Sequence, residues 1–430
     1  MTAEIVIMNK QAVAIAADSA VTIPGQKTFS ANKLFALSKY HPVCVMVYGS
    51  ASFMGIPGET IIKSYRKALG KKGFEALADY ADDFLAFLEA NRTVFPESGQ
   101  LEYFRTIILD YYAGIREQIG KRVDALIRRQ GPINPEQVKG IVAQLVREQL
   151  DFWQSASKPA GTIETRVKQL GTAYSGIIRK AKKDIFHKLP MAPSDSARLS
   201  RIAVNLIVRH GPGSSGVVIA GFGRKDVFPA LRWFSLQGIV RNRLRFTEHQ
   251  GQVIDLETTA AILPFAQHEM VATFMNGVEP HYQAAIETGV SKIVDEYPNV
   301  ILDQIDKLDE DDKRALKDQL KIAGATMLEQ YRKDLHRYRI GNYVNPIMSV
   351  VTHLPKHELA AMAESLVRLT SFKRKVTLQA ETVAEPIDVA VISKGDGFIW
   401  IKRKHYFQPE LNPQFFTNYY REDQDEQQKE

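Results

Sequence analysis

The amino-terminal region contains the residue types that a nucleophilic site needs, namely Thr2, Asp18, Lys33 and Gly49. Thr2 directly follows Met1 and becomes the first residue if that methionine is removed. A free amino-terminal threonine then carries a hydroxyl nucleophile and an α-amine on one residue. The pKa of such an amine is about 7.7 to 8.0, so part of it is neutral near pH 7 and can accept the hydroxyl proton. This chemistry needs no histidine.

The same chemistry needs a cation that favours the neutral amine, a carboxylate that holds the cation, and a backbone donor for the oxyanion. Asp18 ends the second expected strand, Lys33 begins the third element, and Gly49 follows the VCVMVY strand. Each also has a simpler structural interpretation. Asp18 could cap a turn with Ser19, Lys33 could be a solvated lysine at a strand edge, and Gly49 could be a turn glycine.

The elements that must position these residues alternate between strand-rich and helix-rich stretches. The runs EIVIM, AVAIAAD, NKLFALS and VCVMVYG have the β-branched, turn-punctuated pattern of strands. Apolar residues then recur at three- and four-residue spacing, which predicts helices. The pattern predicts two sheets with helices on their outer faces rather than a doubly wound fold. The predicted segments are 1–55 (strands), 56–205 (helical insertion), 206–275 (strands and a helix), 276–350 (second helical insertion), 351–407 (helix and strands) and 408–430 (polar tail).

Two later helices differ in character. The stretch 303–339 is so polar that we expect it to project from the body or to pack on a partner. By contrast, KHELAAMAESLVRL should lie against a sheet. Its apolar face consists of Leu359, Met362, Ala363 and Leu366.

Composition narrows the class of protein. The chain has 430 residues, a net charge of +7 and one cysteine, Cys44, within the apolar run PVCVMVYG. A single cysteine excludes an intramolecular disulfide, predicts a buried thiol and favours a cytoplasmic protein. No stretch has the roughly 18 apolar residues that a membrane span needs, and the start lacks the pattern of a secretory signal. The basic residues alternate with carboxylates, which favours solvated helix faces over a nucleic-acid partner.

Two further motifs carry little chemistry. His353 and His357 have metal-ligand spacing, but Pro355 between them indicates a helix start instead. The HGPGSSG stretch at 210–216 lacks the lysine and helix of a phosphate-binding loop and indicates a loop entering a strand. We therefore expect neither a metal nor a cofactor.

The quoted amino-terminal segments resemble a known family. TAEIVIMNKQAVAIAADSAVT, NKLFALS and VMVYGSAS are similar to the opening of the proteasomal β-subunit and of its bacterial two-component protease relative. GVVIAGFGRKDVFPALRWFSLQG and PIDVAVISKGDGFIWI resemble later strand pairs of these amino-terminal nucleophile (Ntn) hydrolases. The resemblance implies an α+β fold with a four-layer α/β/β/α sandwich and large helical insertions. It also implies that Thr2 is the nucleophile, Asp18 its charge partner, Lys33 the catalytic lysine and Gly49 the oxyanion donor.

The sequence departs from the family pattern in several places. Gly223 stands where an aspartate is common, and Phe53 stands where the loop after Gly49 usually has its acid. ILPFAQHEM occupies the region of the family's serine loop, so Gln267 or His268 is a candidate substitute. Before the IDV strand, the candidate equivalents of the usual acid and serine are Glu381 and Thr382.

These observations predict a threonine-type peptidase or amidase that cleaves peptide or amide bonds through an acyl-enzyme on Thr2. The resemblance also implies a homo-oligomer, because proteasome relatives assemble in rings. Two alternatives remain: an inactive proteasome-fold scaffold whose helical insertions bind a protein partner, and an amidase for a small acylated metabolite. Nucleic-acid binding through the basic helices is a third, weaker hypothesis.

Overall fold

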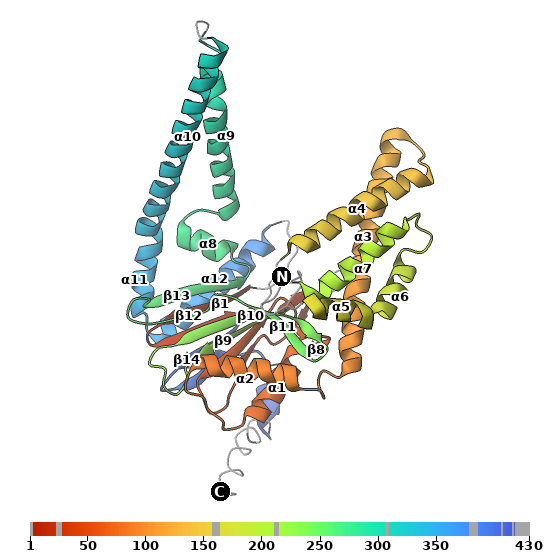
Figure 1. Ribbon diagram of the computed structural model, residues 1–430. Helices are drawn as coiled ribbons and strands as arrows, with labels where there is room; N and C mark the ends of the chain where they lie inside the picture. The colour runs from red at the N-terminus through yellow and green to blue at the C-terminus, as the bar shows by residue number, and fades with distance from the viewer. Residues whose placement is uncertain are drawn as a thin grey trace. The chain divides into compact units, whose positions relative to one another are not determined.

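The chain forms two compact units in the computed structural model (Figure 1). Unit 1 comprises Met1–Leu34 and Ile254–Glu430, and unit 2 comprises Phe35–Val253. The structure describes residues 3–22, 28–156, 164–209, 215–305, 309–377, 386–405, 407–414 and 417.

Unit 1 contains a five-stranded sheet in the order β13-β1-β2-β14-β15. Each pair of neighbours in it is antiparallel. Its strands are β1 (Ala3–Asn9), β2 (Ala12–Ala17), β13 (Ala260–Ala266), β14 (Asp388–Ser393) and β15 (Gly397–Lys402), and β3 (Ala20–Thr22) and β4 (Thr28–Ser30) form a separate hairpin. The turn after β1 is closed by Asn9, whose side-chain oxygen accepts from the backbone N–H of Gln11 at 2.9 Å. The predicted first two strands and the last strand pair are thus confirmed.

The strand β13 is one that the sequence analysis did not identify, since it placed ILPFAQHEM in the region of the family's serine loop. Pro264 lies in the middle of it and pairs with Ile5 of β1. Proline cannot donate to a ladder and is tolerated on edge strands, and β13 lies at the end of the described sheet. The proline that weakens the strand pattern in the sequence therefore marks an edge position.

In unit 1, α11 (Asn345–His353) and α12 (Lys356–Lys375) pack on one face of this sheet. The other helices of the unit are α8 (Glu269–Asn276), α9 (Pro280–Leu302) and α10 (Glu310–Arg339), with a π-helical turn at Ile340–Val344 and a 3₁₀ turn at Pro409–Leu411. The expected apolar face of α12 packs on Ile5, Ala14 and their neighbours. Its members are Leu359, Met362, Ala363 and Leu366. α12 begins directly after Pro355, which confirms the predicted helix start.

The helices α9 and α10 form an arm that extends away from the sheet of unit 1 (Figure 1). Within α10, Gly324 is buried while its neighbours are partly or fully exposed, so the prediction that this polar stretch projects is confirmed. The two helices are tightly packed at this glycine. A Cβ placed there would lie 2.8 Å from Val294 Cγ1 and 3.2 Å from Tyr297 Cε1.

We predict that Gly324→Val opens the arm, because the added side chain needs space that Val294 and Tyr297 occupy. Gly289→Val is the matched control, since a Cβ at Gly289 meets nothing within 4 Å. Amide hydrogen exchange across α9 and α10 should accelerate in the first variant and stay near wild type in the second. Equal exchange in the two variants would show that Gly324 is not a packing constraint.

Unit 2 contains a second sheet in the order β11-β10-β9-β6-β5, with β12 paired to β10. Its strands are β5 (Leu34–Ala36), β6 (Val43–Tyr48), β9 (Ser215–Gly221), β10 (Ala230–Val240), β11 (Arg243–Glu248) and β12 (Gln252–Val253), and β7 (Ser52–Phe53) pairs with β8 (Ile56–Pro57). Helices α1 (Gly58–Leu69) and α2 (Leu77–Ala90) pack on this sheet through a shared apolar core. The predicted strand meander after residue 214 is confirmed.

The remaining helices of unit 2 form a bundle with its own core. The bundle consists of α3 (Glu97–Gln130), α4 (Pro135–Ser155), α5 (Glu164–Ala173), α6 (Ser175–Ile185) and α7 (Pro193–Val208). Trp153 is buried in this core, as expected of a structural tryptophan, and its indole N–H donates to the Tyr111 hydroxyl at 2.6 Å. Among the described helices of either unit, none is long and apolar enough to cross a membrane.

Cys44 lies in β6 and is fully buried, as the sequence predicts. Burial raises the pKa of its thiol to about 12. We therefore predict that iodoacetamide at pH 8 labels Cys44 in the denatured chain but not in the native one, because the native thiol is almost entirely protonated and covered. Mass spectrometry before and after denaturation measures this, and rapid labelling of the native chain would contradict it.

Candidate active site

Asp18 and Ala3 join the end of β2 to the start of β1. The register places Ala17 opposite Glu4, so the residue after β2 meets the residue that begins β1. The backbone N–H of Ala3 donates to Asp18 Oδ1 at 3.0 Å, and the N–H of Asp18 donates to the carbonyl of Ala3 at 3.1 Å. The other carboxylate oxygen accepts from the N–H of Ala20 at 3.1 Å. Asp18 is therefore fixed by backbone groups on both oxygens.

Lys33 completes this cluster. Its ammonium nitrogen lies 2.6 Å from Asp18 Oδ1 and 3.3 Å from Glu4 Oε1. The three side chains are buried, with exposed fractions of 3% for Lys33 and 0% for each carboxylate. Two buried carboxylates at one site repel each other unless a cation lies between them, and Lys33 supplies that cation. We call Glu4, Asp18 and Lys33 the buried charge cluster.

Glu4 is a member of this cluster that sequence reasoning missed. The odd-numbered residues of β1 belong to the core under α12, and Glu4 lies on the opposite face of the strand because side chains alternate. The sequence feature that could have indicated it is the single carboxylate at the start of the otherwise apolar run EIVIM. An isolated charge in a strand that is buried throughout needs a counter-ion, but the contact with Lys33 is visible only in the folded structure.

Gln267 lies beside the start of β1 as well. Ala266, the residue before it, pairs with Ala3 and has a left-handed φ of 64°. The side-chain oxygen of Gln267 accepts from Arg374 Nε of α12 at 2.9 Å, and both side chains are buried. Arg374 also lies 3.8 Å from Glu269. The structure thus brings Gln267 to the sheet edge where Asp18 holds Ala3, and it adds Arg374, which the sequence analysis did not consider.

A partly buried lysine, Lys404, and a buried aspartate, Asp388, contact the residue that follows Asp18. The ammonium of Lys404 donates to Ser19 Oγ at 2.6 Å and to Asp388 Oδ2 at 2.8 Å. The Ser19 hydroxyl in turn donates to the carbonyl of Pro386. Asp388 lies opposite Ala17, so this network fixes the residue after Asp18 to β14.

The other predicted site residues fall in different parts of the structure. Thr2, Glu381 and Thr382 lie outside the described residues. Gly49 follows β6 in unit 2 with a left-handed φ of 78°, which fits the predicted turn. Its role as the oxyanion donor stays a prediction.

Two departures from the family pattern have structural reasons within unit 2. Phe53 is a core residue whose ring packs edge-on against Phe95, with centroids 5.5 Å apart. Gly223 lies so close to the start of α2 that a Cβ would be 2.4 Å from Ala76 Cα. Neither position has room for a solvated carboxylate. Within the described ranges, no group of three or more histidine, cysteine or acidic side chains is arranged to hold a metal ion.

Comparison with known proteins adds little to this geometry. No protein-family model matches the sequence, and no curated protein matches it either. Among solved structures, the chain is similar to Anbu (ancestral beta-subunit) from Yersinia bercovieri, with 10% identity and a TM-score of 0.26 over 94% of this chain and 88% of that chain. A TM-score this low does not establish a shared fold.

We predict that Lys33→Met destabilises β1 and β2 by about 3–5 kcal/mol, because it leaves the carboxylates of Glu4 and Asp18 buried without their cation. The measurement is the free energy of opening of the β1 and β2 amides by hydrogen exchange. Adding Glu4→Gln to Lys33→Met should recover part of the loss.

The control for this prediction is Lys63→Met, which removes an exposed lysine paired with Glu59. Exposed pairs of this kind contribute roughly 0–1 kcal/mol. Losses of equal size in the Lys33 and Lys63 variants would show that the buried charge cluster does not hold the two strands together.

Proposed function

We propose that the chain is an Ntn-type amidohydrolase in which Thr2, after removal of Met1, attacks a peptide or amide carbonyl. The observation that carries this proposal is the buried Lys33–Asp18 pair, in which Asp18 accepts the amide N–H of Ala3. That amide is the peptide bond to Thr2. A buried ammonium is therefore fixed beside the backbone that carries the candidate nucleophile.

The proposed reaction divides the work between Thr2 and its surroundings. The Thr2 hydroxyl transfers its proton to the α-amine, and its oxygen forms a bond to the substrate carbonyl carbon. The Lys33 ammonium favours the neutral amine and stabilises the developing negative charge, while Glu4 and Asp18 hold the ammonium in place. The backbone N–H of Gly49 is the proposed donor to the oxyanion.

Collapse of the tetrahedral intermediate breaks the carbon–nitrogen bond, and the protonated amine gives its proton to the leaving amine. The acyl group is then an ester of Thr2. Water attacks that ester with the α-amine as base, which releases a carboxylic acid and restores the hydroxyl. The overall change is hydrolysis of one amide bond, with no oxidant, reductant or cofactor.

This mechanism is proposed together with a fold and an assembly. The two antiparallel sheets, each with helices packed on it, support a four-layer α/β/β/α sandwich in which the helical bundle and the arm are the insertions. A homo-oligomer in the cytoplasm is the assembly we propose, with a peptide or another amide as substrate. Faster hydrolysis of small acyl amides than of unfolded protein would identify an amidase rather than a peptidase.

The test is intact mass spectrometry after exposure to a β-lactone that acylates nucleophilic threonines, followed by peptide mapping. We predict loss of Met1 and one adduct on Thr2, retained in Thr2→Ser and abolished in Thr2→Ala. Thr288→Ala is the matched control, because this threonine of α9 is exposed and its hydroxyl only donates to its own helix. Among these variants, only Thr2→Ala should hydrolyse amides at the background rate.

An unlabelled chain that retains Met1 would overturn the proposal, since a blocked amine cannot act as the base. That result would instead support a non-catalytic protein that binds a partner through its helices.

A further inference from the structure

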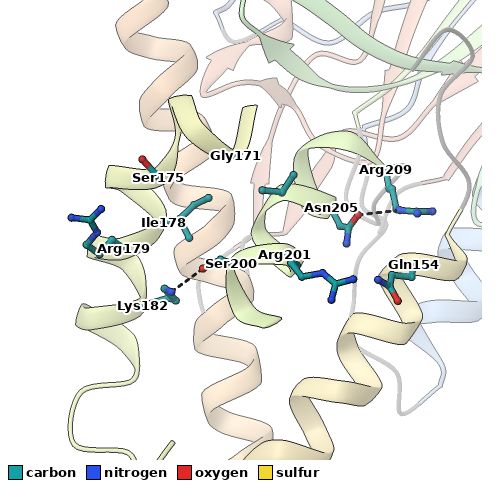
Figure 2. A pocket seen from close by; sticks show the side chains of 11 residues that line it. Gln154, Gly171, Ser175, Ile178, Arg179, Lys182, Ser200, Arg201, Asn205 and Arg209 are labelled. Carbon is teal, nitrogen blue, oxygen red and sulfur yellow. Dashed lines mark hydrogen bonds between the residues drawn. The ribbon is translucent and has the colours of Figure 1, made fainter. Parts of the chain in front are cut away.

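The helical bundle of unit 2 contains a cavity of about 510 Å³ (Figure 2). It is lined by residues of α4, α5, α6 and α7 and by Arg209, which directly follows α7. Its volume lies within the range of roughly 300–1,000 Å³ that is typical of sites for small ligands. Ile178 and Val204 supply apolar wall, and Asn205 and Gln154 supply side-chain amides.

The charged residues that line this cavity are all cations. They are Arg179, Lys182, Arg201 and Arg209, and no aspartate or glutamate is among the lining residues. Figure 2 shows Arg201 and Arg209 extending toward the side where Gln154 lies, while Lys182 reaches toward Ser200 on the other side. Positive charge is therefore present at two ends of the cavity rather than at one point.

The hydrogen bonds of these cations are to neutral groups. Lys182 Nζ donates to the hydroxyls of Ser196 and Ser200, at 3.0 and 2.8 Å, and to the carbonyl of Ser196 at 3.0 Å. Arg209 donates to the side-chain oxygen of Asn205 at 3.2 Å and to a backbone carbonyl. Among the residues that the structure describes, none of the four cations of the cavity forms an ion pair.

Other cations of the bundle do have carboxylate partners. Arg122 forms a bidentate pair with Glu148, and Lys121 pairs with Glu117. The buried carboxylate Asp195 is likewise paired, with Arg198 at 2.5 Å. The cavity differs from these pairs because its lining holds four cations and no carboxylate.

Electrostatics favours an anion at this place. Desolvation by burial, with a contribution from the nearby charge of Arg179, lowers the pKa of Lys182. Like charges around a partly enclosed volume repel each other, and a bound anion removes that repulsion while accepting hydrogen bonds from the guanidinium groups. Arginine and lysine are also the side chains that recognise phosphate oxygens.

We propose that this cavity binds a compact organic phosphate that carries at least two negative charges. Arg201 and Arg209 at one end of the cavity and Lys182 at the other fit two anionic groups, and the apolar wall between the helices fits a small organic portion. A nucleic acid is the less suitable occupant, because a cavity of about 510 Å³ has the size of a small-ligand site rather than of a surface along which a polymer runs. This binding site is independent of the chemistry proposed for Thr2.

The test is isothermal titration calorimetry of the full-length chain with inorganic pyrophosphate, which presents two linked phosphate groups. We expect saturable binding that weakens at least tenfold in Arg201→Gln and in Lys182→Gln, and that weakens with added salt. Lys180→Gln is the matched control: it lies exposed on α6, removes the same charge and does not line the cavity.

The controls keep the outcomes distinct. Arg201 is exposed, so its variant should melt like the wild-type chain, and loss of binding in it reports on the cavity rather than on folding. Absence of saturable binding would overturn the proposal, as would equal weakening in the Lys180 variant. Binding of a single-stranded RNA that depends on Arg201, without binding of pyrophosphate, would also overturn it in favour of a nucleic-acid surface.

Discussion

The buried ammonium of Lys33 is the interaction on which the start of the unit 1 sheet depends. It connects three separate segments, because Glu4 belongs to β1, Asp18 follows β2 and Lys33 precedes β5. Without it, two carboxylates would share a site from which water is excluded. The same contact fixes Asp18, which in turn holds the amide of Ala3. Folding of the strands and placement of the candidate catalytic groups therefore rest on one charge.

The charges of the buried charge cluster and those of the cavity are neutralised in different ways. In unit 1, the buried lysine is compensated by carboxylates of the chain itself, and the arrangement is complete without a ligand. In the helical bundle, Lys182 and Arg209 of the cavity donate to neutral hydroxyl, amide and carbonyl oxygens. Charges that are neutralised by other side chains of the chain are typical of a structural or preorganised site. Charges that need a ligand to neutralise them are typical of a binding site.

Most of the elements could be predicted from the sequence because their patterns are local. Alternating or continuous apolar runs gave β1, β2, β6, β9 and the last strand pair, and the spacing of apolar residues gave α12 and the helices of the bundle. β13 could not be predicted, because Pro264 is compatible with a strand only at an edge, and edge position is a property of the folded sheet.

Some site residues could be predicted because they lie at strand ends or in turns, which local sequence patterns indicate. Asp18 and Lys33 do come together. Glu4, Arg374 and the network around Lys404 depend on pairing between segments that are far apart along the chain, and one sequence contains no record of such pairing. The predictable and unpredictable residues differ for a physical reason: local patterns indicate secondary structure, whereas the partners of buried charges depend on tertiary contacts.

Unit 1 is built from two separate stretches of sequence, and this affects the nascent chain on the ribosome. β1 lies between β2 and β13, and β13 begins only at Ala260, after the whole of unit 2 has been made. At about 5–20 residues per second, translation from Leu34 to that point takes roughly 10–45 s. During this interval the first strand lacks one of its two neighbours in the sheet. If Thr2 is the nucleophile as proposed, this is the interval in which an aminopeptidase would remove Met1 before β13 pairs with β1.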